Sequence, residues 1–188
     1  RGLPDTGEGA AQVLKETATL LYQHSLFNGH PRFFGYITSS PAPLGVLGDF
    51  LASAVNQNVG AFKLSPLATE IEAQTIRWIA ELIGYPAVCG GLFVSGGTMA
   101  NFTAILTALR NTAEYDTTAE GLQSGKRRGR FTIYMADHEG HVSIVRAADM
   151  LNLGRDAVRR VPSKNDFTMD VNALEKMLDE DRARGDIP

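Results

Sequence analysis

The chain has 188 residues, of which 44% are hydrophobic and 21% are charged, and its formal net charge is −3. This length suits about one domain of ordinary size. A charge so close to balance argues against nucleic acid or an acidic membrane as the main partner. The single cysteine, Cys89, excludes an internal disulfide and is typical of a reducing compartment. No run reaches the roughly 18 apolar residues of a membrane span, and no leader pattern is recognisable, so the sequence predicts a cytoplasmic protein.

Two helices and an irregular connection are expected in the first third of the chain. Apolar side chains recur at helical spacing over residues 10–22 and again over residues 44–55. Glycines and prolines between them, in residues 28–43, predict an irregular connection.

A third helix is the best-marked element of the sequence. Ser65-Pro66 combines an N-cap with a first-turn proline, and Thr69–Glu72 matches a capping box as an alternative start. Gly84, with a proline just beyond it, ends this helix.

From residue 91 onward, short apolar runs alternate with helical patterns. Strands are expected over residues 91–95, 131–136 and 157–161, each followed by a helix, and Asp170 can cap the last helix. This alternation predicts an α/β fold with a mostly parallel sheet and crossover helices.

The predicted sheet is small for its class. Three strands are few for a parallel sheet, and the chain stops at Asp186–Pro188, where a further strand is due. We therefore expect the 188 residues to be part of a longer polypeptide.

Residues 111–130 form the longest polar connection, and the basic run Lys126–Arg130 within it is interpreted as a solvated loop rather than a nucleic-acid site.

Ser95-Gly96-Gly97-Thr98 stands between a predicted strand and a predicted helix. A helix start offers unpaired N–H groups and the positive end of the helix dipole, and glycines allow a phosphate to approach the backbone closely. The alternative is a tight turn that merely needs glycine, and the tetrapeptide alone does not decide between the two.

Asp137-His138-Glu139-Gly140-His141 follows the second predicted strand. Ligands of open α/β sheets bind at the carboxyl ends of strands, so these side chains are expected at the same edge as the glycine turn. The spacing does not suit the HExxH metal motif. A histidine that stacks on a ligand or hydrogen-bonds to it is one interpretation, and a surface or helix-capping histidine is the other.

A third stretch, His30–Thr38, combines aromatic residues with a proline on the irregular connection. Such residues can line a pocket, although ordinary packing is the commoner role.

Four motifs in order closely resemble the group II pyridoxal-phosphate-dependent decarboxylases, which include aromatic-amino-acid, histidine, glutamate and cysteine-sulfinate decarboxylases. The resemblance extends from about residue 30 to residue 154. It rests on His30–Tyr36 (HPRFFGY), Ser65–Glu72 (SPLATEIE), Ser95–Asn101 (SGGTMAN) and His141–Ala148 (HVSIVRAA).

This resemblance implies a role for five residues. Gly97 and Thr98 match the turn that holds the phosphate of pyridoxal 5'-phosphate. His141 matches a catalytic histidine that stacks on the pyridine ring of the cofactor and lies beside the substrate. Tyr36 and Thr38 match a segment that borders the substrate, where this chain is one residue shorter than the family pattern.

The resemblance also implies a fold and an activity. The fold is that of the fold-type-I PLP-dependent transferases, with residues 1–64 as a helical and irregular segment and residues 65–188 as the first part of the cofactor-binding domain. The activity is decarboxylation of an L-amino acid to an amine and carbon dioxide, with the cofactor as electron sink, no metal, and a homodimer as the assembly. The Schiff-base lysine is expected beyond Pro188, because no family motif contains any of the lysines present, namely Lys15, Lys63, Lys126, Lys164 and Lys176.

Three other functions remain open from the sequence. The same fold supports an aldehyde-forming oxidative decarboxylation or a carbon–carbon lyase reaction. A non-catalytic protein could keep the phosphate turn without the lysine. A metal hydrolase that uses His138 and His141 is the most remote of the three.

Overall fold

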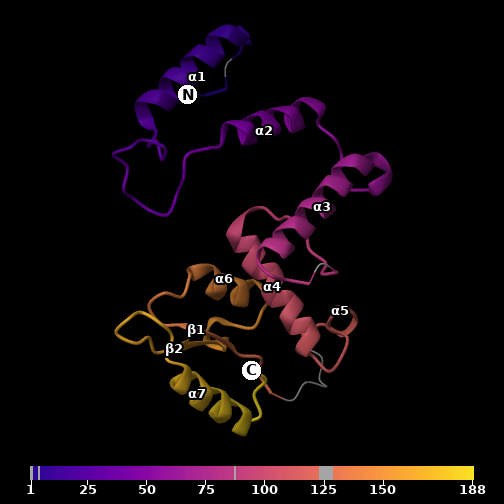
Figure 1. Ribbon diagram of the computed structural model, residues 1–188, viewed down its shortest axis with the longest axis vertical. Helices are drawn as coiled ribbons and strands as arrows, with labels where there is room; N and C mark the ends of the chain where they lie inside the picture. Colours follow the sequence, from indigo (N-terminus) through magenta and orange to yellow (C-terminus); the bar gives the residue numbers. More distant parts are fainter. Residues whose placement is uncertain (1, 4, 87, 123–128) are drawn as a thin grey trace. The chain divides into compact units, whose positions relative to one another are not determined.

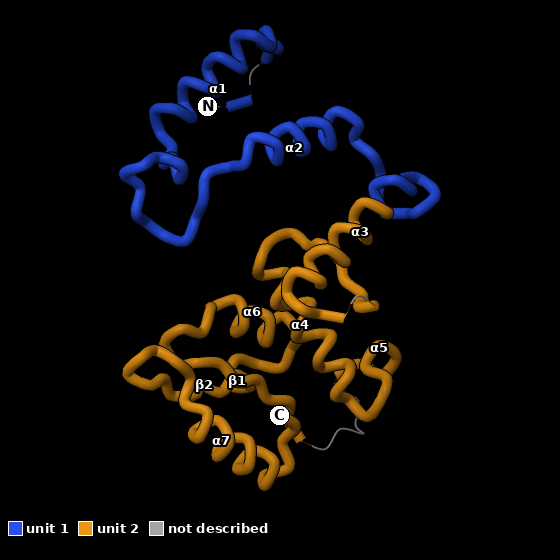
Figure 2. The backbone as a smooth tube through the Cα atoms, in the orientation of Figure 1, with its two compact units in different colours: residues 1–69 blue, residues 70–188 orange. Residues whose placement is uncertain are grey.

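The computed structural model describes residues 2–3, 5–86, 88–122 and 129–188. Its contacts divide the chain into two compact units, residues 1–69 and residues 70–188 (Figure 2). Of the basic run at residues 126–130, the first three residues lie outside the described part, so its interpretation as a solvated loop stays a prediction.

The first unit is helical and irregular, as the sequence predicts. Helix α1 covers Ala10–His24 and helix α2 covers Pro43–Val55, with an irregular connection between them (Figure 1). Neither helix buries a single residue. A short 3-10 helix, η1 (Phe62–Leu64), leads into helix α3 (Pro66–Leu82).

Helix α3 begins at the predicted proline. Ser65, only 1% exposed, accepts the N–H of Thr69 with its carbonyl oxygen at 3.2 Å. The Ser65 hydroxyl donates to the side-chain oxygen of Gln57. The alternative start at Thr69 is therefore wrong, since Thr69 lies within the first turn of the helix. Gly84, in the left-handed region with φ of 72°, follows the helix end as predicted.

The second unit contains a parallel sheet with helices around it. Strand β1 (Ile133–Ala136) pairs with strand β2 (Val158–Val161) in parallel, with Ile133 opposite Val158. Phe131 and Ile187 form a further parallel bridge. The helices are α4 (Gly96–Thr112), α5 (Thr117–Glu120), α6 (Val142–Met150), the 3-10 helix η2 (Arg155–Ala157) and α7 (Val171–Ala183). Figure 1 shows α6 and α7 on opposite sides of the two strands.

The predicted strand at Gly91–Ser95 is wrong. The segment has no strand conformation, and Leu92 and Phe93 are more than half exposed. The N–H of Phe93 donates to Glu72 Oε1 at 2.9 Å. A strand requires a neighbouring strand for its backbone groups, and here a side chain takes that role instead.

The core of the second unit lies between α4, α6 and the sheet. Its buried side chains are Leu109, Phe131, Met135, Ala148, Leu151, Leu153, Ala157 and Val158. Ala147 and Ala148 have no exposed surface, so α6 packs with methyl-sized side chains on its inner face. Among the described residues, no helix is both long enough and apolar enough to span a membrane.

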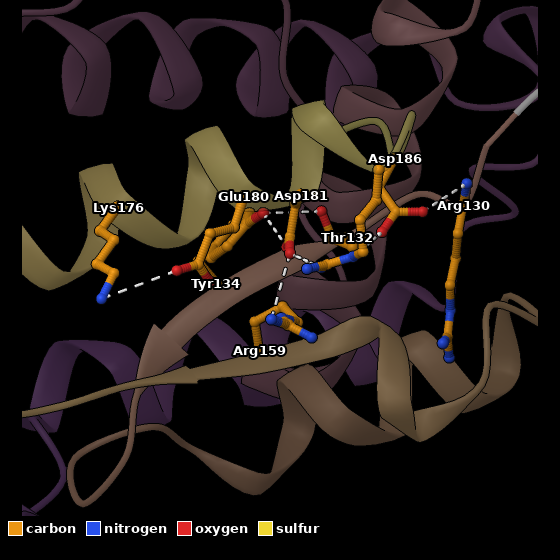
Figure 3. Close-up of polar contacts among 9 residues, drawn as sticks. Arg130, Thr132, Tyr134, Arg159, Lys176, Glu180, Asp181 and Asp186 are labelled. Atoms are coloured by element: carbon orange, nitrogen blue, oxygen red, sulfur yellow. Dashed lines mark hydrogen bonds and ion pairs between the residues drawn. The ribbon is translucent and has the colours of Figure 1, made fainter.

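A buried carboxylate joins α7 to both strands. Asp181 has no exposed surface, and its Oδ2 accepts the hydroxyl of Tyr134 from β1 at 2.5 Å (Figure 3). Its Oδ1 forms ion pairs with Arg159 of β2 at 3.2 Å and with Arg184. Burial, and then the hydrogen bond to Asp181, raise the pKa of Tyr134 above its ordinary value.

Candidate functional site

The start of α4 offers hydrogen-bond donors without acceptors. Ser95 precedes the helix and gives no side-chain cap. The N–H groups of Gly97 and Thr98 have no hydrogen-bond partner within the described part of the chain. A Cβ atom built on Gly97 would meet nothing within 4 Å. This helix start is therefore open and electropositive, as the sequence predicts for an anion site.

Glycine is required just before these donors. Gly96 has a φ of 83° and donates its N–H to Val94 at 2.9 Å. This left-handed conformation turns the chain from an extended approach into the helix, and a side chain at this position would be strained.

His141 caps helix α6 at the other side of the candidate site. Its Nδ1 accepts the backbone N–H of Ser143 at 3.2 Å and lies 2.7 Å from the Ser143 hydroxyl oxygen. The helix-capping interpretation of this histidine is thus confirmed. His141 remains exposed although it caps the helix, so a ligand can reach it.

A buried hydrogen bond connects the two helix starts. Asn101 of α4 donates from Nδ2 to the Ser143 hydroxyl oxygen at 2.7 Å, and Ser143 has no exposed surface. Asn101 lies three residues after Thr98, and Ser143 lies two residues after His141. Gly97, Thr98 and His141 therefore stand on adjoining first turns that share one polar contact.

The carboxyl ends of β1 and β2 are linked by a separate polar contact. Asp137 Oδ1 accepts the Ser163 N–H at 3.0 Å and the Ser163 hydroxyl at 2.7 Å. The same hydroxyl lies 2.6 Å from Glu139 Oε2. The bond from the Ser163 hydroxyl is the main reason that the pKa of Asp137 is lowered.

His138 is exposed and pairs with its neighbour. Its Nε2 lies 3.7 Å from Asp137 Oδ2. The described residues contain no group of three or more histidine, cysteine, aspartate and glutamate side chains that could hold a metal ion.

Tyr36 and Thr38 lie in the first unit, on the connection between α1 and α2. Both side chains are exposed, and Tyr36 has a φ of 60°. His30, at the start of the same stretch, accepts the N–H of Arg32 at its Nδ1 at 3.2 Å. The aromatic side chains Phe34 and Tyr36 are about nine-tenths exposed, so ordinary packing does not explain them within this unit.

The sequence patterns predict no role for Asn101 or Ser143. Their positions in the sequence nevertheless contain a signal, because each lies one helical turn or less from a predicted site residue. A polar residue at such a position, in the inward half of an otherwise apolar helix pattern, indicates a buried hydrogen bond.

Comparisons with known proteins give the family and the fold. The pyridoxal-dependent decarboxylase conserved domain matches residues 1–188. An aromatic-L-amino-acid decarboxylase from Bacillus atrophaeus is 30% identical over 186 residues, which cover 99% of this chain and 36% of the relative. A glutamate decarboxylase-like protein from Gibberella zeae is 32% identical over 167 residues, which cover 88% of this chain and 31% of the relative.

A solved structure extends the comparison to the fold. The crystal structure of mouse CSAD covers 100% of this chain with a TM-score of 0.88 at 26% sequence identity, and the match spans 38% of the mouse chain. This likeness confirms the predicted fold class. The chain spans about a third of the length of these relatives.

Proposed function

Because this chain belongs to the family of pyridoxal-dependent decarboxylases, we propose that it forms the phosphate-holding part of an enzyme that converts an L-amino acid to an amine and carbon dioxide. The observation that carries the proposal is the open start of α4, tied by Asn101 and Ser143 to the start of α6. The names of the relatives, which include decarboxylases of aromatic amino acids and of L-2,4-diaminobutyrate, support the reaction class.

The residues at the start of α4 fit the phosphate of pyridoxal 5'-phosphate. The N–H groups of Gly97 and Thr98 are unpaired within the described part of the chain, and the Thr98 hydroxyl adds a further donor. Helix α4 has 17 residues and no acidic residue in its first turn, so no fixed negative charge on that turn competes with an anion. We assign Gly97 and Thr98 to the phosphate on these grounds.

His141 is assigned to the ring of the cofactor. The family resemblance gives it this role, and its exposed imidazole, fixed at one nitrogen by Ser143, supports the assignment. When bound, the cofactor withdraws the electrons that the departing carboxylate leaves at the substrate. The part that His141 plays is to orient the ring and to exclude water from one side of it.

The remaining proposals concern the substrate, the two segments of the chain, the subunit assembly and the location of the protein. Tyr36 and Thr38 border the substrate, residues 1–64 contribute to subunit association, and residues 65–188 begin the cofactor-binding domain. The complete protein is a cytoplasmic homodimer. The family resemblance supports these assignments except the cytoplasmic location, which is proposed from the sequence alone, and the apolar side chains that α2 exposes support the homodimer.

The phosphate assignment is tested by removing one donor. In the complete polypeptide that contains this chain, Thr98→Val should weaken the affinity for pyridoxal phosphate roughly tenfold, since a hydrogen bond to a charged group contributes about 1.5–3 kcal/mol. The affinity is measured by cofactor titration with absorbance detection. Thr107→Val is the matched control, because Thr107 lies on the exposed face of the same helix and bonds only to Thr103 within the described residues.

Unchanged affinity for pyridoxal phosphate in Thr98→Val would show that Thr98 does not bind the phosphate.

The reaction itself is tested by mass spectrometry of the products formed from a panel of amino acids. An amine together with carbon dioxide is expected. An aldehyde, or a product of carbon–carbon cleavage, would overturn the proposed reaction in favour of another chemistry on the same fold.

A further inference from the structure

We propose that Ser143 and Asn101 are positioning residues that fix the neutral imidazole of His141 as the tautomer with its proton on Nε2. The functional importance of this tautomer rests on the proposed function of His141. The tautomer itself is a property of this chain and can be measured without cofactor or substrate.

The order of donors along the contact leads to this conclusion. A side-chain amide nitrogen only donates, so Asn101 Nδ2 uses the Ser143 oxygen as its acceptor at 2.7 Å. The Ser143 hydroxyl proton then remains for another acceptor. His141 Nδ1, at 2.7 Å from the same oxygen, is that acceptor. Nδ1 can accept only when it carries no proton, which leaves the ring proton on Nε2.

The backbone supplies a second and independent donor. The N–H of Ser143 points at the same Nδ1 at 3.2 Å, and its direction is set by the first turn of α6. A hydroxyl can rotate to suit either tautomer, whereas a helical N–H cannot. A proton on Nδ1 would face this N–H and leave two donors opposed in a partly buried contact.

Fixing the tautomer determines what the exposed edge of His141 offers a ligand. With the proton on Nε2, the neutral ring presents a hydrogen-bond donor there and no acceptor. The edge is therefore matched to an oxygen acceptor, such as a carboxylate, rather than to a donor group. Because Ser143 is fully buried and Asn101 belongs to α4, the ring plane is also held relative to the helix that carries Gly97 and Thr98.

The chain contains its own comparison for the role of the hydroxyl. His30 Nδ1 accepts the backbone N–H of Arg32 at 3.2 Å, the same distance and the same two-residue spacing as in His141 and Ser143. Among the described residues, His30 has no serine hydroxyl at its Nδ1, and His24 has no side-chain hydrogen bond at all. Within the described residues, the ring of His141 thus accepts from two donors, that of His30 from one and that of His24 from none.

The test is ring ¹⁵N NMR of the full chain, labelled at its four histidines, at about pH 9, where an ordinary imidazole is neutral. The shift difference between the two ring nitrogens is largest for a single tautomer and shrinks for a mixture. We expect the largest difference for His141, an intermediate one for His30 and the smallest for His24, with Nε2 carrying the proton in His141. The His141→Gln variant assigns its signals.

Two variants test the role of the buried contact. Ser143→Ala removes the hydroxyl and keeps the backbone N–H, so the shift difference of His141 should fall to the level of His30. Asn101→Asp replaces the amide donor by a carboxylate, which draws the Ser143 hydroxyl proton away from Nδ1, and the difference should fall at least as far. The second variant keeps the proposal testable if the first does not fold.

Three results would overturn the proposal. These are a protonated Nδ1 in His141, a His141 shift difference as small as that of His24, and an unchanged difference in a folded variant of Ser143 or Asn101. None of these results depends on decarboxylation, so failure of the tautomer assignment and failure of the proposed function remain distinguishable.

Discussion

Tyr134 provides a pH-dependent contribution to the stability of the second unit. Its pKa is raised by burial and by its hydrogen bond to Asp181, so the folded chain holds the phenol proton more tightly than the unfolded chain does. For a raised pKa, the contribution is complete below the ordinary value of about 10 and is lost as the pH rises through the raised pKa. We therefore expect the free energy of unfolding to fall in this alkaline range.

Tyr134→Phe should remove this part of the alkaline dependence. Urea unfolding at a series of pH values measures it, followed by the fluorescence of Trp78, the only tryptophan of the chain. Tyr85→Phe is the matched control, since Tyr85 is 62% exposed. Equal alkaline slopes in wild type and Tyr134→Phe would contradict the prediction.

At the level of single residues, the sequence predicts which residues could bind a ligand better than it predicts the side chains that hydrogen-bond to them. Ser95–Thr98 is a candidate anion site because two glycines stand at a predicted helix start, although a tight turn would need glycine as well. His141 is recognisable only through the motif around it. Its two partners are not, because Asn101 and Ser143 are distant along the chain and meet only when α4 packs beside α6.

Between elements, Asp137 and Ser163 join the ends of β1 and β2. Ser163→Ala should raise the pKa of Asp137 towards its ordinary value of about 3.9, because the hydroxyl bond is the main cause of the lowering. A lowered pKa gives stability that is present above the ordinary value and lost as the pH falls through the lowered one. The variant should therefore lose less stability on acidification. Carboxylate ¹³C NMR titration measures the pKa directly.

The chain offers a matched control for this experiment. The Thr168 hydroxyl is likewise the main cause of a lowered pKa at Asp166. Thr168→Val should raise the pKa of Asp166 and leave that of Asp137 unchanged. A change at Asp137 in the Thr168 variant would mean that the effect is general and not due to Ser163.

Helix α7 depends on its first residue in a way that can be measured. Asp170 accepts the N–H groups of Asn172 at 3.0 Å and Ala173 at 3.3 Å, so Asp170→Ala should cost about 1 kcal/mol of unfolding free energy. Denaturant unfolding measures the loss. Asp179→Ala, which removes the same charge from an exposed position on the same helix, should change the stability by no more than about 0.5 kcal/mol. Equal losses would rule out capping as the cause.

The sequence predicts the helices and the two parallel strands β1 and β2, whereas the strand expected over residues 91–95 is wrong. The helix over residues 44–55 and the cap at Asp170 follow from spacing and local hydrogen bonds, which the sequence contains. The run at residues 91–95 has the composition of a buried strand, yet strand formation depends on a partner that composition does not reveal. Its side chains instead lie exposed, and its backbone bonds to Glu72.

For the whole molecule, the exposed apolar face of α2 predicts association. Leu47, Phe50 and Leu51 are each more than 60% exposed. We expect the complete polypeptide to sediment as a dimer, with the double variant Leu47→Gln and Leu51→Gln shifted towards monomer, because apolar area is then no longer removed from water. Leu82→Gln, at another exposed leucine, is the comparison. A wild-type protein of monomer mass would overturn the homodimer.

The two alanines on the inner face of α6 limit how this chain can evolve. Ala147 and Ala148 have no exposed surface, and the helix they belong to is only nine residues long. A larger side chain at either position would push the whole helix outward and carry His141 away from α4. We therefore expect natural selection to keep both interior positions small, while the exposed positions of α6 vary more among related proteins, as an alignment of homologues would test.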